Sequence, residues 1–359
     1  MQHSHITPDR LFSLGTGYRC AKVLLCAVEL DVFTALDGQP RVAADLARML
    51  SIHSRSARDF FDALVALGLL QRDADGRYAN TMEASLYLDR NKPSYLGGMF
   101  NQFNAREYQM WSKLGDALRT GEPQIGSTSA EHFATIYDDP ERFRTFVHAM
   151  TASSLSAAKA IAETFPWSNY RTLMDIGTAQ GCFPVQVARL HPHIAGGGFD
   201  LPELSTAFAD YVCKNELSGR LRFHPGNFFQ DDLPAADVLV FGRVLHNWDL
   251  ATKKMLLRKA YQAIPKGGAV VVYDMLIDDE RRTAADGLLS SLNMLLWTNA
   301  GFGYGGSECA DWMREAGFSD TRVEPLVAGQ SMVTGQKQKN PGFVLFLARE
   351  CLVPVRKMG

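Results

Sequence analysis

Short apolar runs rich in β-branched residues alternate with amphipathic helical stretches through the second half of the 359-residue chain, and this rhythm constrains the fold more than any other feature. Runs of this length and composition predict strands. They lie at 171–176, 197–200, 221–224, 237–241 and 269–274, with helical patterns such as 183–190 and 251–264 between them. Regular alternation of strands and helices is typical of a parallel sheet covered by helices on both faces.

The end of the chain departs from this alternation. Two further strand candidates, 321–326 and 342–348, are separated by a segment rich in Gly, Gln, Lys and Asn rather than by a helix. Strands joined without a crossover helix can pair antiparallel. We therefore expect an α/β domain with a seven-stranded sheet in which one edge strand is reversed.

The first half of the chain is helical in pattern almost throughout, with one recognisable block. Two helical stretches, 42–50 and 56–67, are followed by two short strands around the turn at Asp75–Gly76. Helix, turn, helix and hairpin make a winged helix, which could bind DNA through its second helix or act as a packing or dimerisation module. The second helix carries Arg55 and Arg58 but also Asp59 and Asp62, which favours the structural interpretation over a ligand-sensing transcription factor.

These patterns predict three regions: a winged-helix-like domain at 1–95, a helical linker and substrate-lining region at 96–165, and an α/β domain at 166–359. The 37 Lys and Arg residues nearly balance 39 Asp and Glu, so nucleic acid is not an expected partner. We expect no membrane-spanning segment, because no apolar run reaches about 18 residues. The first residues lack a signal-peptide pattern, and the 6 cysteines form no CxxC pair, which together predict a cytoplasmic protein.

A glycine-containing loop follows the first predicted strand of the α/β domain. Its sequence, DIGTAQG at 175–181, would end the strand and open a helix. Gly177 permits a tight turn and close approach of a ligand, and a helix start offers free N–H groups. The spacing is G-x-x-x-G with Ala179 inside it, a poor match to the dinucleotide fingerprint G-x-G-x-x-G. A nicotinamide-dependent oxidoreductase is therefore disfavoured, although a loop of this kind can also serve packing alone.

Polar residues follow the next three predicted strands. Asp200 ends the second strand, where an acid can accept both hydroxyls of a ribose or cap the following turn. The third strand leads to Asn227 and Phe228, which can hydrogen-bond to a purine and stack on it. The fourth leads to Arg243 and His246. Because open α/β sheets bind ligands at the carboxyl ends of their strands, these residues predict a nucleoside-binding site.

The sequence resembles the S-adenosylmethionine-dependent O-methyltransferases of the caffeate and hydroxyindole type, in their bacterial and plant branches. The resemblance extends over most of the chain and lies in the order and spacing of five segments: DIGTAQG, FDLPEL, GNFF, RVLHNWD and DWMREAGF. It implies a Rossmann-like catalytic domain, an N-terminal winged-helix domain that forms a homodimer and closes over the substrate, S-adenosylmethionine as cofactor with S-adenosylhomocysteine as product, and no metal.

The resemblance also assigns roles to individual positions. His246 falls on the general base, and Asp274 on an acid that orients it. The implied cofactor contacts are Asp175, Gly177, Asp200, Leu201, Asn227, Phe228, Arg243 and Tyr137. The implied acceptor-lining residues, whose apolar stripes would equally suit a packed core, are Phe103, Trp111, Phe146, Met150, Asn293, Met294 and Trp297. The implied reaction is O-methylation of a phenolic hydroxyl on a small aromatic natural product.

Several positions depart from the family pattern. Asn247 and Asn227 stand where the family commonly has Asp, and Asp274 stands where it commonly has Glu. A second acid that flanks the base in the family has no clear match, since Glu308 is shifted along the chain. Relatives on this fold perform other reactions. C- or N-methylation, or a reaction without methyl transfer such as hydroxylation or rearrangement, is therefore kept as an alternative.

Overall fold

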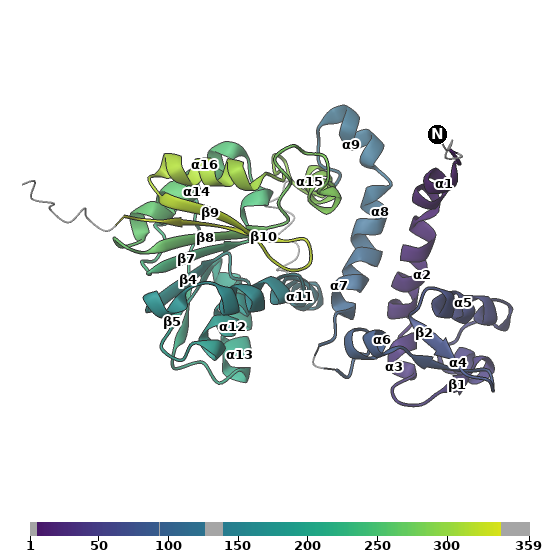
Figure 1. Cartoon of the computed structure of the whole chain (residues 1–359). Coiled ribbons are helices and arrows are strands. Elements are labelled where there is room, and N and C mark those ends of the chain that lie inside the picture. Colours follow the sequence, from purple (N-terminus) through teal and green to yellow (C-terminus); the bar gives the residue numbers. More distant parts are fainter. Residues whose placement is uncertain (1–5, 93, 126–138, 339–359) are drawn as a thin grey trace, which may run out of the picture.

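The computed structural model describes residues 6–92, 94–125 and 139–338. Figure 1 shows a helical N-terminal module on one side and a sheet domain on the other, with α7 and α8 running as a column between them. The three predicted regions, with boundaries at 95/96 and 165/166, stay a prediction.

The N-terminal module is a winged helix preceded by helices, as predicted. Its hairpin turns at Gly76, whose φ of 76° only glycine adopts without strain, and Asp73 accepts a hydrogen bond from the Arg77 N–H at 2.8 Å. The strand order is β1-β3-β2. The elements are α1 (Asp9–Thr16), α2 (Tyr18–Glu29), α3 (Val32–Ala35), β1 (Arg41–Val42), α4 (Ala43–Met49), α5 (Ser54–Ala66), β2 (Leu70–Arg72), β3 (Arg77–Asn80) and α6 (Met82–Tyr87).

A helical region connects this module to the sheet domain. Between α7 and α8, this region includes one turn of π-helix, a form that often occurs at functional sites. The elements are α7 (Gly97–Gln102), the π-helical turn η1 (Phe103–Glu107), α8 (Tyr108–Trp111), α9 (Leu114–Thr120), α11 (Pro140–Thr164) and the short η2 (Trp167–Asn169). The long helix α11 packs against both α7 and α12 of the sheet domain, so it joins the two halves.

The sheet domain has seven strands in the order β6-β5-β4-β7-β8-β10-β9. Five strands are parallel, as predicted from the alternation. The strands are β4 (Thr172–Ile176), β5 (Ala195–Asp200), β6 (Leu221–Pro225), β7 (Val238–Gly242), β8 (Ala269–Asp274), β9 (Ser319–Pro325) and β10 (Ser331–Gln336). The helices are α12 (Cys182–Leu190), η3 (Pro202–Leu204), α13 (Ser205–Lys214), η4 (Leu245–Asn247), α14 (Leu250–Ala263), α15 (Ala285–Trp297) and α16 (Gly306–Ala316).

Two expectations about the end of the sheet are wrong. The reversed strand is β10, which lies inside the sheet between β8 and β9 and is antiparallel to both, so it is not an edge strand. Residues 331–336, expected to form a turn, make this strand because Met332 and Val333 are buried against the sheet core. The candidate strand 342–348 lies outside the described residues.

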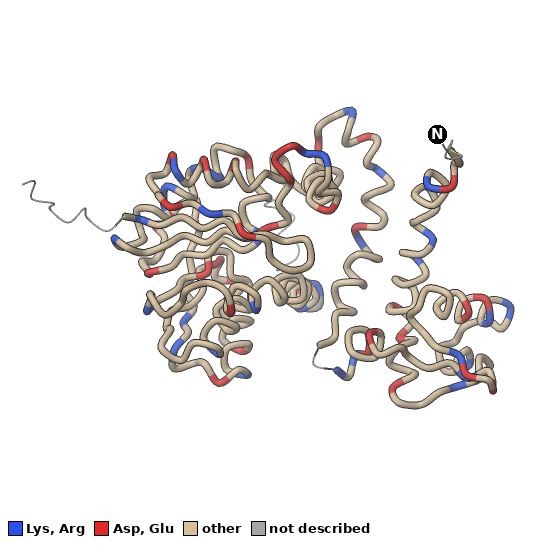
Figure 2. The backbone as a smooth tube through the Cα atoms, in the orientation of Figure 1, with Lys and Arg blue, Asp and Glu red and all other residues tan. Residues whose placement is uncertain are grey.

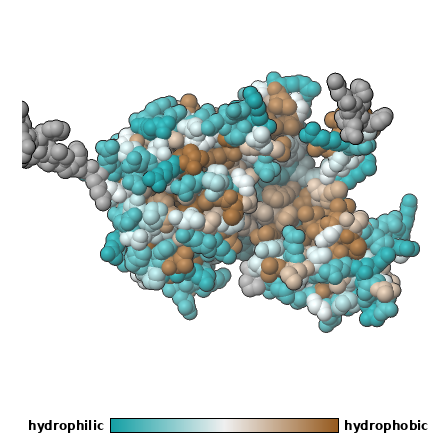
Figure 3. All heavy atoms as spheres, viewed as in Figure 1, coloured by the Kyte–Doolittle hydropathy of each residue, from teal (hydrophilic) through white to brown (hydrophobic). Residues whose placement is uncertain are grey.

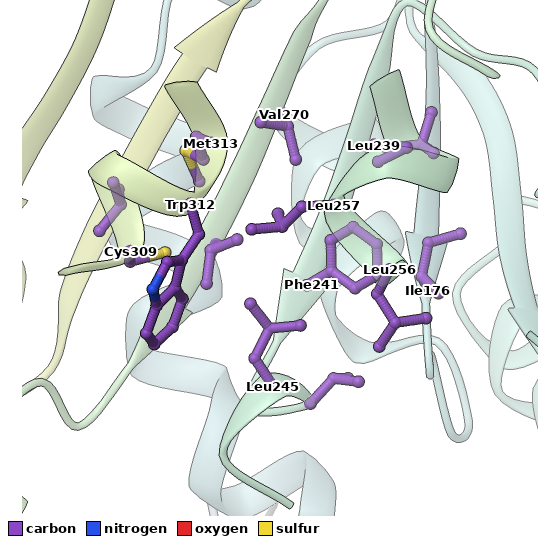
Figure 4. Close-up of a cluster of buried hydrophobic side chains, with 14 of the residues drawn as sticks. Ile176, Leu239, Phe241, Leu245, Leu256, Leu257, Val270, Cys309, Trp312 and Met313 are labelled. Atoms are coloured by element: carbon purple, nitrogen blue, oxygen red, sulfur yellow. The ribbon is translucent and has the colours of Figure 1, made fainter. Parts of the chain in front are cut away.

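Two layers of apolar side chains hold the helices onto the sheet. All six residues of β8 are buried, which explains its continuous run of apolar, β-branched residues. On one face, β-strand residues such as Leu239, Phe241 and Val270 pack against Leu256 and Leu257 of α14, together with α16 (Figure 4). On the other face, the core includes Trp167, Phe183 and Tyr273 and is covered by α11 and α12. This packing fixes the carboxyl ends of β4, β5, β7 and β8 next to one another.

Charges of both signs are interspersed over the described chain (Figure 2). On α5, the helix that would read DNA in a winged-helix regulator, Asp62 forms ion pairs with Arg58 at 3.7 Å and with Arg72 at 2.6 Å. These arginines are therefore partly neutralised within the module, which does not favour the DNA-binding alternative.

The helical stretch Asp9–Glu29 exposes large apolar side chains, including Leu11, Phe12 and Leu14. Figure 3 shows apolar atoms gathered in the hollow between the two halves of the molecule. By the test of length and composition alone this stretch could cross a membrane, although Arg19 and Lys22 interrupt its apolar residues. The same test is passed by helices whose apolar face packs against protein, so the finding alone does not assign the stretch to a bilayer.

Candidate active site

The loop after β4 is held in shape by glycine and by a buried acid. Gly177 and Gly181 have φ of 74° and 89°, and Ala179 between them also has a positive φ of 50°. Beneath the loop, the Asp175 carboxylate accepts a hydrogen bond from the Thr178 hydroxyl at 2.8 Å. Burial raises the pKa of Asp175 to about 7, because the charged form loses its hydration. Asp175 therefore supports the loop from below.

Asp200, at the end of β5, lies against this loop. One carboxylate oxygen accepts from the Ala179 N–H at 2.8 Å, and the other from the Leu201 N–H at 2.8 Å. The carboxylate does not cap η3, so the alternative that it serves as a helix cap is wrong. Burial raises the pKa of Asp200 to about 6, although the two N–H groups act in the opposite direction. Each oxygen keeps accepting capacity beyond its one N–H partner, as binding of two ribose hydroxyls requires.

The loop after β6 carries an amide next to aromatic rings. The Asn227 side-chain oxygen accepts from the Phe229 N–H at 2.9 Å, while its amide nitrogen has no hydrogen-bond partner within the described part of the chain. Phe228 packs edge-on against the Trp248 ring, with ring centroids 5.8 Å apart. An amide donor beside an aromatic surface suits the nitrogen acceptors and the face of an adenine ring.

The turn after β7 places a histidine. Arg243 has a φ of 56°, unusual for a residue with a side chain, and its N–H donates to the Tyr273 carbonyl at 2.9 Å. This bend leads into the single turn η4, on which His246 lies. The Asn247 amide donates to the carbonyls of Arg243 and Val244 at 3.3 and 3.2 Å. Asn247 therefore stabilises the bend and does not act on the imidazole, in a place where the family commonly has an acid.

His246 and Asp274 form a buried pair. The His246 Nδ1 lies 2.7 and 2.8 Å from the two carboxylate oxygens of Asp274, at the end of β8. His246 is 6% exposed and Asp274 2%. The His246 Nε2 has no hydrogen-bond partner among the residues that the structure describes. A carboxylate on Nδ1 favours the tautomer with the proton on Nδ1, which leaves the Nε2 lone pair available to accept a proton.

Two more groups, neither of which was predicted from the sequence, stabilise the carboxylate of this pair. The Tyr304 hydroxyl donates to Asp274 at 3.1 Å, and the Met275 N–H donates at 2.9 Å. Burial alone would raise the pKa of Asp274, but His246, Arg243 and the Met275 N–H outweigh it and lower the pKa below its usual value. The only sequence signal for Tyr304 is its place within the glycine-rich segment 301–306, which does not reveal its partner.

Glu308 does not supply the second flanking acid of the family. Its carboxylate accepts a hydrogen bond from the Gly305 N–H at 2.8 Å at the start of α16. It therefore stabilises the helix N-terminus, where a negative charge is favourable. On the Asp274 side of the pair, the Tyr304 hydroxyl provides the additional polar contact.

The helix α15 links the His246 turn to the acceptor-lining residues, because it contacts both η4 and α8. The Trp111 indole N–H donates to the Asn293 side-chain oxygen at 3.1 Å. Met294 is buried on the same helix, and the Arg106 guanidinium lies 4.9 Å from the centroid of the Trp297 ring. The structure thus brings four of the predicted acceptor-lining residues into one region, although Trp111 and Trp297 also pack in a local apolar cluster.

The remaining predicted residues are less closely tied to this region. Phe103 packs edge-on against Phe100 of α7, with ring centroids 6.0 Å apart. Phe146 and Met150 are half-buried on α11, the helix that packs against α7. Tyr137 lies outside the described residues.

A half-buried glutamate near this region was not predicted from the sequence. Glu107 ends the π-helical turn η1, and burial raises its pKa, while Arg243 and Arg106 act to lower it. Arg243 lies in the turn that carries His246, so Glu107 brings a carboxyl group toward that turn from the linker region. No group of three or more potential metal ligands occurs in the described parts of the chain.

A glycine loop, an acid after the second strand and one reversed strand in a seven-stranded sheet together define the class of Rossmann-like methyltransferase domains. The chain belongs to the O-methyltransferase family: the family model of the O-methyltransferase domain matches residues 111–319, and that of the O-methyltransferase dimerisation domain matches residues 12–90.

The chain is similar to both bacterial and vertebrate methyltransferases. The tetracenomycin polyketide synthesis 8-O-methyl transferase TcmO of Streptomyces glaucescens is 40% identical over 94% of this chain and 99% of its own. The N,N-dimethyltransferase OxyT of Streptomyces rimosus is 37% identical over 88% of this chain and 92% of its own. Human N-acetylserotonin methyltransferase, solved in complex with S-adenosylmethionine, superposes with a TM-score of 0.86 at 27% identity, covering 94% of this chain and 100% of that one.

Proposed function

We propose that this protein transfers a methyl group from S-adenosylmethionine to a phenolic hydroxyl of a small aromatic natural product, with His246 as the general base. The observation that carries the proposal is the buried His246–Asp274 pair, whose Nδ1–carboxylate contact of 2.7 Å leaves Nε2 free of partners in the described chain. Family membership supports methyl transfer, and the similarity to TcmO supports an aromatic polyketide-type acceptor.

The residues at the strand ends fit S-adenosylmethionine. Asp200 would hold the ribose hydroxyls, Asn227 and Phe228 would border the adenine, and the loop at Gly177 would hold the amino-acid portion. Arg243, Leu201 and Tyr137 are further proposed contacts, whereas Asp175 would act through the loop that it supports. When bound, S-adenosylmethionine supplies a methyl group already activated on a positively charged sulfur. The protein therefore needs to align the acceptor and remove its proton.

His246 would remove that proton at Nε2. A phenol has a pKa near 10 and is mostly protonated at neutral pH, so a base within hydrogen-bond reach assists the attack. As the imidazole takes the proton, the Asp274 carboxylate stabilises the positive charge and keeps the ring in orientation. Trp111, Asn293, Met294 and Trp297 would form part of a pocket that positions the aromatic acceptor and excludes water, with Phe103, Phe146 and Met150 as further lining residues.

We also propose that the protein is a homodimer formed through the N-terminal module. The match to the dimerisation-domain family begins at residue 12, within α1, and covers all of α2. The apolar α1 side chains Leu11, Phe12 and Leu14 are exposed in the single chain. Burial in a dimer would remove this apolar surface from water.

We further propose that the protein is located in the cytoplasm. Fractionation of the producing cell tests this location.

N-methylation is a second candidate, favoured by the 37% identity to OxyT. An amine acceptor attacks through a lone pair that it already has, so its reaction depends less on a base during methyl transfer. The two reactions can therefore be separated by their dependence on His246.

The test is a panel of paired aromatic acceptors, each offering either a hydroxyl or an amino group at the same position. We expect wild-type protein to give hydroxyl methylation, detected as a mass increase of about 14 Da with the site assigned by NMR. In His246→Gln, loss of general-base catalysis should lower this rate by about 10²- to 10⁴-fold. Calorimetry with S-adenosylhomocysteine checks that the variant still binds the cofactor product. Methylation of the amino compounds alone, or an undiminished rate in the variant, would contradict the proposal.

A further inference from the structure

A fully buried lysine lies behind the His246–Asp274 pair and has no part in the mechanism above. Lys253 is in the first turn of α14 and is 0% exposed. Lysine is almost never buried completely unless its ammonium group has partners. The contacts of this side chain therefore require an explanation.

The Lys253 ammonium bridges two segments that are distant in sequence. Its Nζ donates to the Trp248 carbonyl at 2.7 Å and to the Phe302 carbonyl at 3.0 Å. The same nitrogen lies 3.1 Å from the centroid of the Phe302 ring and 5.4 Å from that of Tyr304. Trp248 follows closely after His246, and Phe302 closely precedes Tyr304. Lys253 thus connects the turn that carries the base to the loop that carries a partner of Asp274.

The two segments also touch each other directly. A side-chain carbon added at Gly301 would lie 2.6 Å from the His246 carbonyl oxygen and 2.7 Å from the Asn247 carbonyl carbon. The Gly301 N–H is held by the Thr298 hydroxyl at 2.8 Å. The loop at 301–304 is therefore packed against the His246 turn, and Lys253 supplies the polar bonds that join them.

The charged groups around Lys253 are compatible with its hydrogen bonds to the two carbonyls inside the protein. Burial lowers the pKa of Lys253 to about 7, while Asp274, Asp249, Glu308 and Cys309 act to raise it. A neutral amine still has two N–H donors, one for each carbonyl. The bridge therefore persists in either protonation state, and we do not interpret it as a pH switch.

We propose that Lys253 is a positioning residue that joins the His246 turn to the Tyr304 loop and so keeps the imidazole aligned with the Asp274 carboxylate. The inference rests on the proposed role of His246 as the base. Lys253 itself touches neither the base nor the acceptor, and it acts through the two backbone segments that it joins. Loss of the bridge should therefore affect turnover more than cofactor binding.

The test replaces Lys253 by methionine, which has a similar length without the ammonium group. We expect kcat to fall by about tenfold or more, since small misplacement of a catalytic group is costly. The affinity for S-adenosylhomocysteine, measured by calorimetry, should stay within about twofold, because the proposed ribose contact Asp200 and the loop at Gly177 follow other strands. In protein labelled with ¹⁵N-histidine, the downfield Nδ1–H resonance, assigned by its absence in His246→Gln, should shift or broaden.

The chain offers a matched control at the other end of α14. Lys337 donates to the carbonyls of Tyr261 and Ile264 at 2.6 and 2.8 Å and lies 4.5 Å from the centroid of the Tyr261 ring. Lys337→Met removes the same kind of bridge away from the site. It should lower thermal stability and leave kcat and the histidine resonance unchanged.

The proposal fails if Lys253→Met keeps wild-type kcat and an unchanged Nδ1–H resonance, whatever happens to its stability. Here kcat is calculated from the concentration of protein that binds the cofactor product. If Lys253→Met does not fold, Lys253→Gln keeps a polar end on a side chain one atom shorter that no longer reaches both carbonyls, and an unchanged resonance and kcat in that variant would overturn the proposal. The NMR measurement needs no acceptor, so it tests the bridge even if wild-type protein methylates none of the phenols. That last outcome would instead count against the proposed function.

Discussion

Asp274→Asn is the sharpest test of the catalytic pair, because it changes one charge and almost no volume. In the wild-type protein three donors converge on the carboxylate: the His246 Nδ1 at 2.7 Å, the Met275 N–H at 2.9 Å and the Tyr304 hydroxyl at 3.1 Å. Asparagine offers only one acceptor oxygen. Its amide nitrogen must replace either Oδ1, which accepts from the Met275 N–H, or Oδ2, which accepts from the Tyr304 hydroxyl, and both positions lie within 2.8 Å of the His246 Nδ1. If the amide nitrogen faces the ring, the imidazole adopts the other tautomer and its proton moves to Nε2.

The size of the effect follows from this change. A proton on Nε2 blocks the atom that should accept the acceptor's proton, so the contribution of general-base catalysis is lost. This contribution is typically about 10²- to 10⁴-fold in rate, or about 3–5 kcal/mol of transition-state stabilisation. Cofactor binding should be spared, because Asp200 and the loop at Gly177 lie on other strands of the sheet.

The assay is the rate of S-adenosylhomocysteine release with a phenolic acceptor, combined with calorimetry for cofactor-product binding. Asp237→Asn is the control: its carboxylate accepts from the N–H groups of Arg171 and Thr172 at 2.7 and 2.9 Å, at the opposite ends of the strands. We expect the control to affect stability but not kcat. Activity of Asp274→Asn within about threefold of wild type, with binding intact, would refute the assignment of this pair as the proton acceptor.

Three further predictions concern neighbouring groups. Tyr304→Phe removes one hydrogen bond to a buried carboxylate and should lower the free energy of unfolding by about 1–3 kcal/mol in urea titrations, with a smaller loss of kcat than Asp274→Asn. Affinity for S-adenosylhomocysteine should weaken as the pH falls through about 6, where Asp200 gains a proton, and calorimetry across that range would show no change if this carboxylate does not bind the ribose. Asp175→Asn should stabilise the ligand-free protein by up to about 4 kcal/mol above pH 7 but by only about 1–2 kcal/mol near pH 5. The folded-state pKa of Asp175 is raised, so the folded protein holds an extra proton between the two pKa values, and wild-type stability falls as the pH rises through that window. Equal effects of the substitution at both pH values in thermal denaturation would contradict this.

Much of the nucleoside site could be predicted from the sequence because its residues follow directly from local patterns. The run at 269–274 is apolar and β-branched because both faces of that strand are buried. Asp200 and the loop at 175–181 follow predicted strands, and neighbouring parallel strands bring their carboxyl ends to one edge. The family resemblance then assigned His246 and Asp274 to one site, where the structure places them in hydrogen-bond contact.

Other features depended on contacts between distant segments. The residues at 331–336 have little strand pattern, and their pairing between β8 and β9 decides their conformation. The hydrogen bond between Trp111 and Asn293 depends on the packing of α8 against α15.

The sequence by itself thus determined the strands of the parallel half and the residues at their carboxyl ends, because each of those signals is carried by a few consecutive residues. Only the tertiary structure decided which side chains support the base. Tyr304 and Lys253 reach the Asp274 region from a glycine-rich loop and from a helix start, and no periodicity or motif encodes those contacts. The reason is physical: a hydrogen bond between segments far apart in the chain requires both to be fixed by packing first, and packing is a property of the whole core.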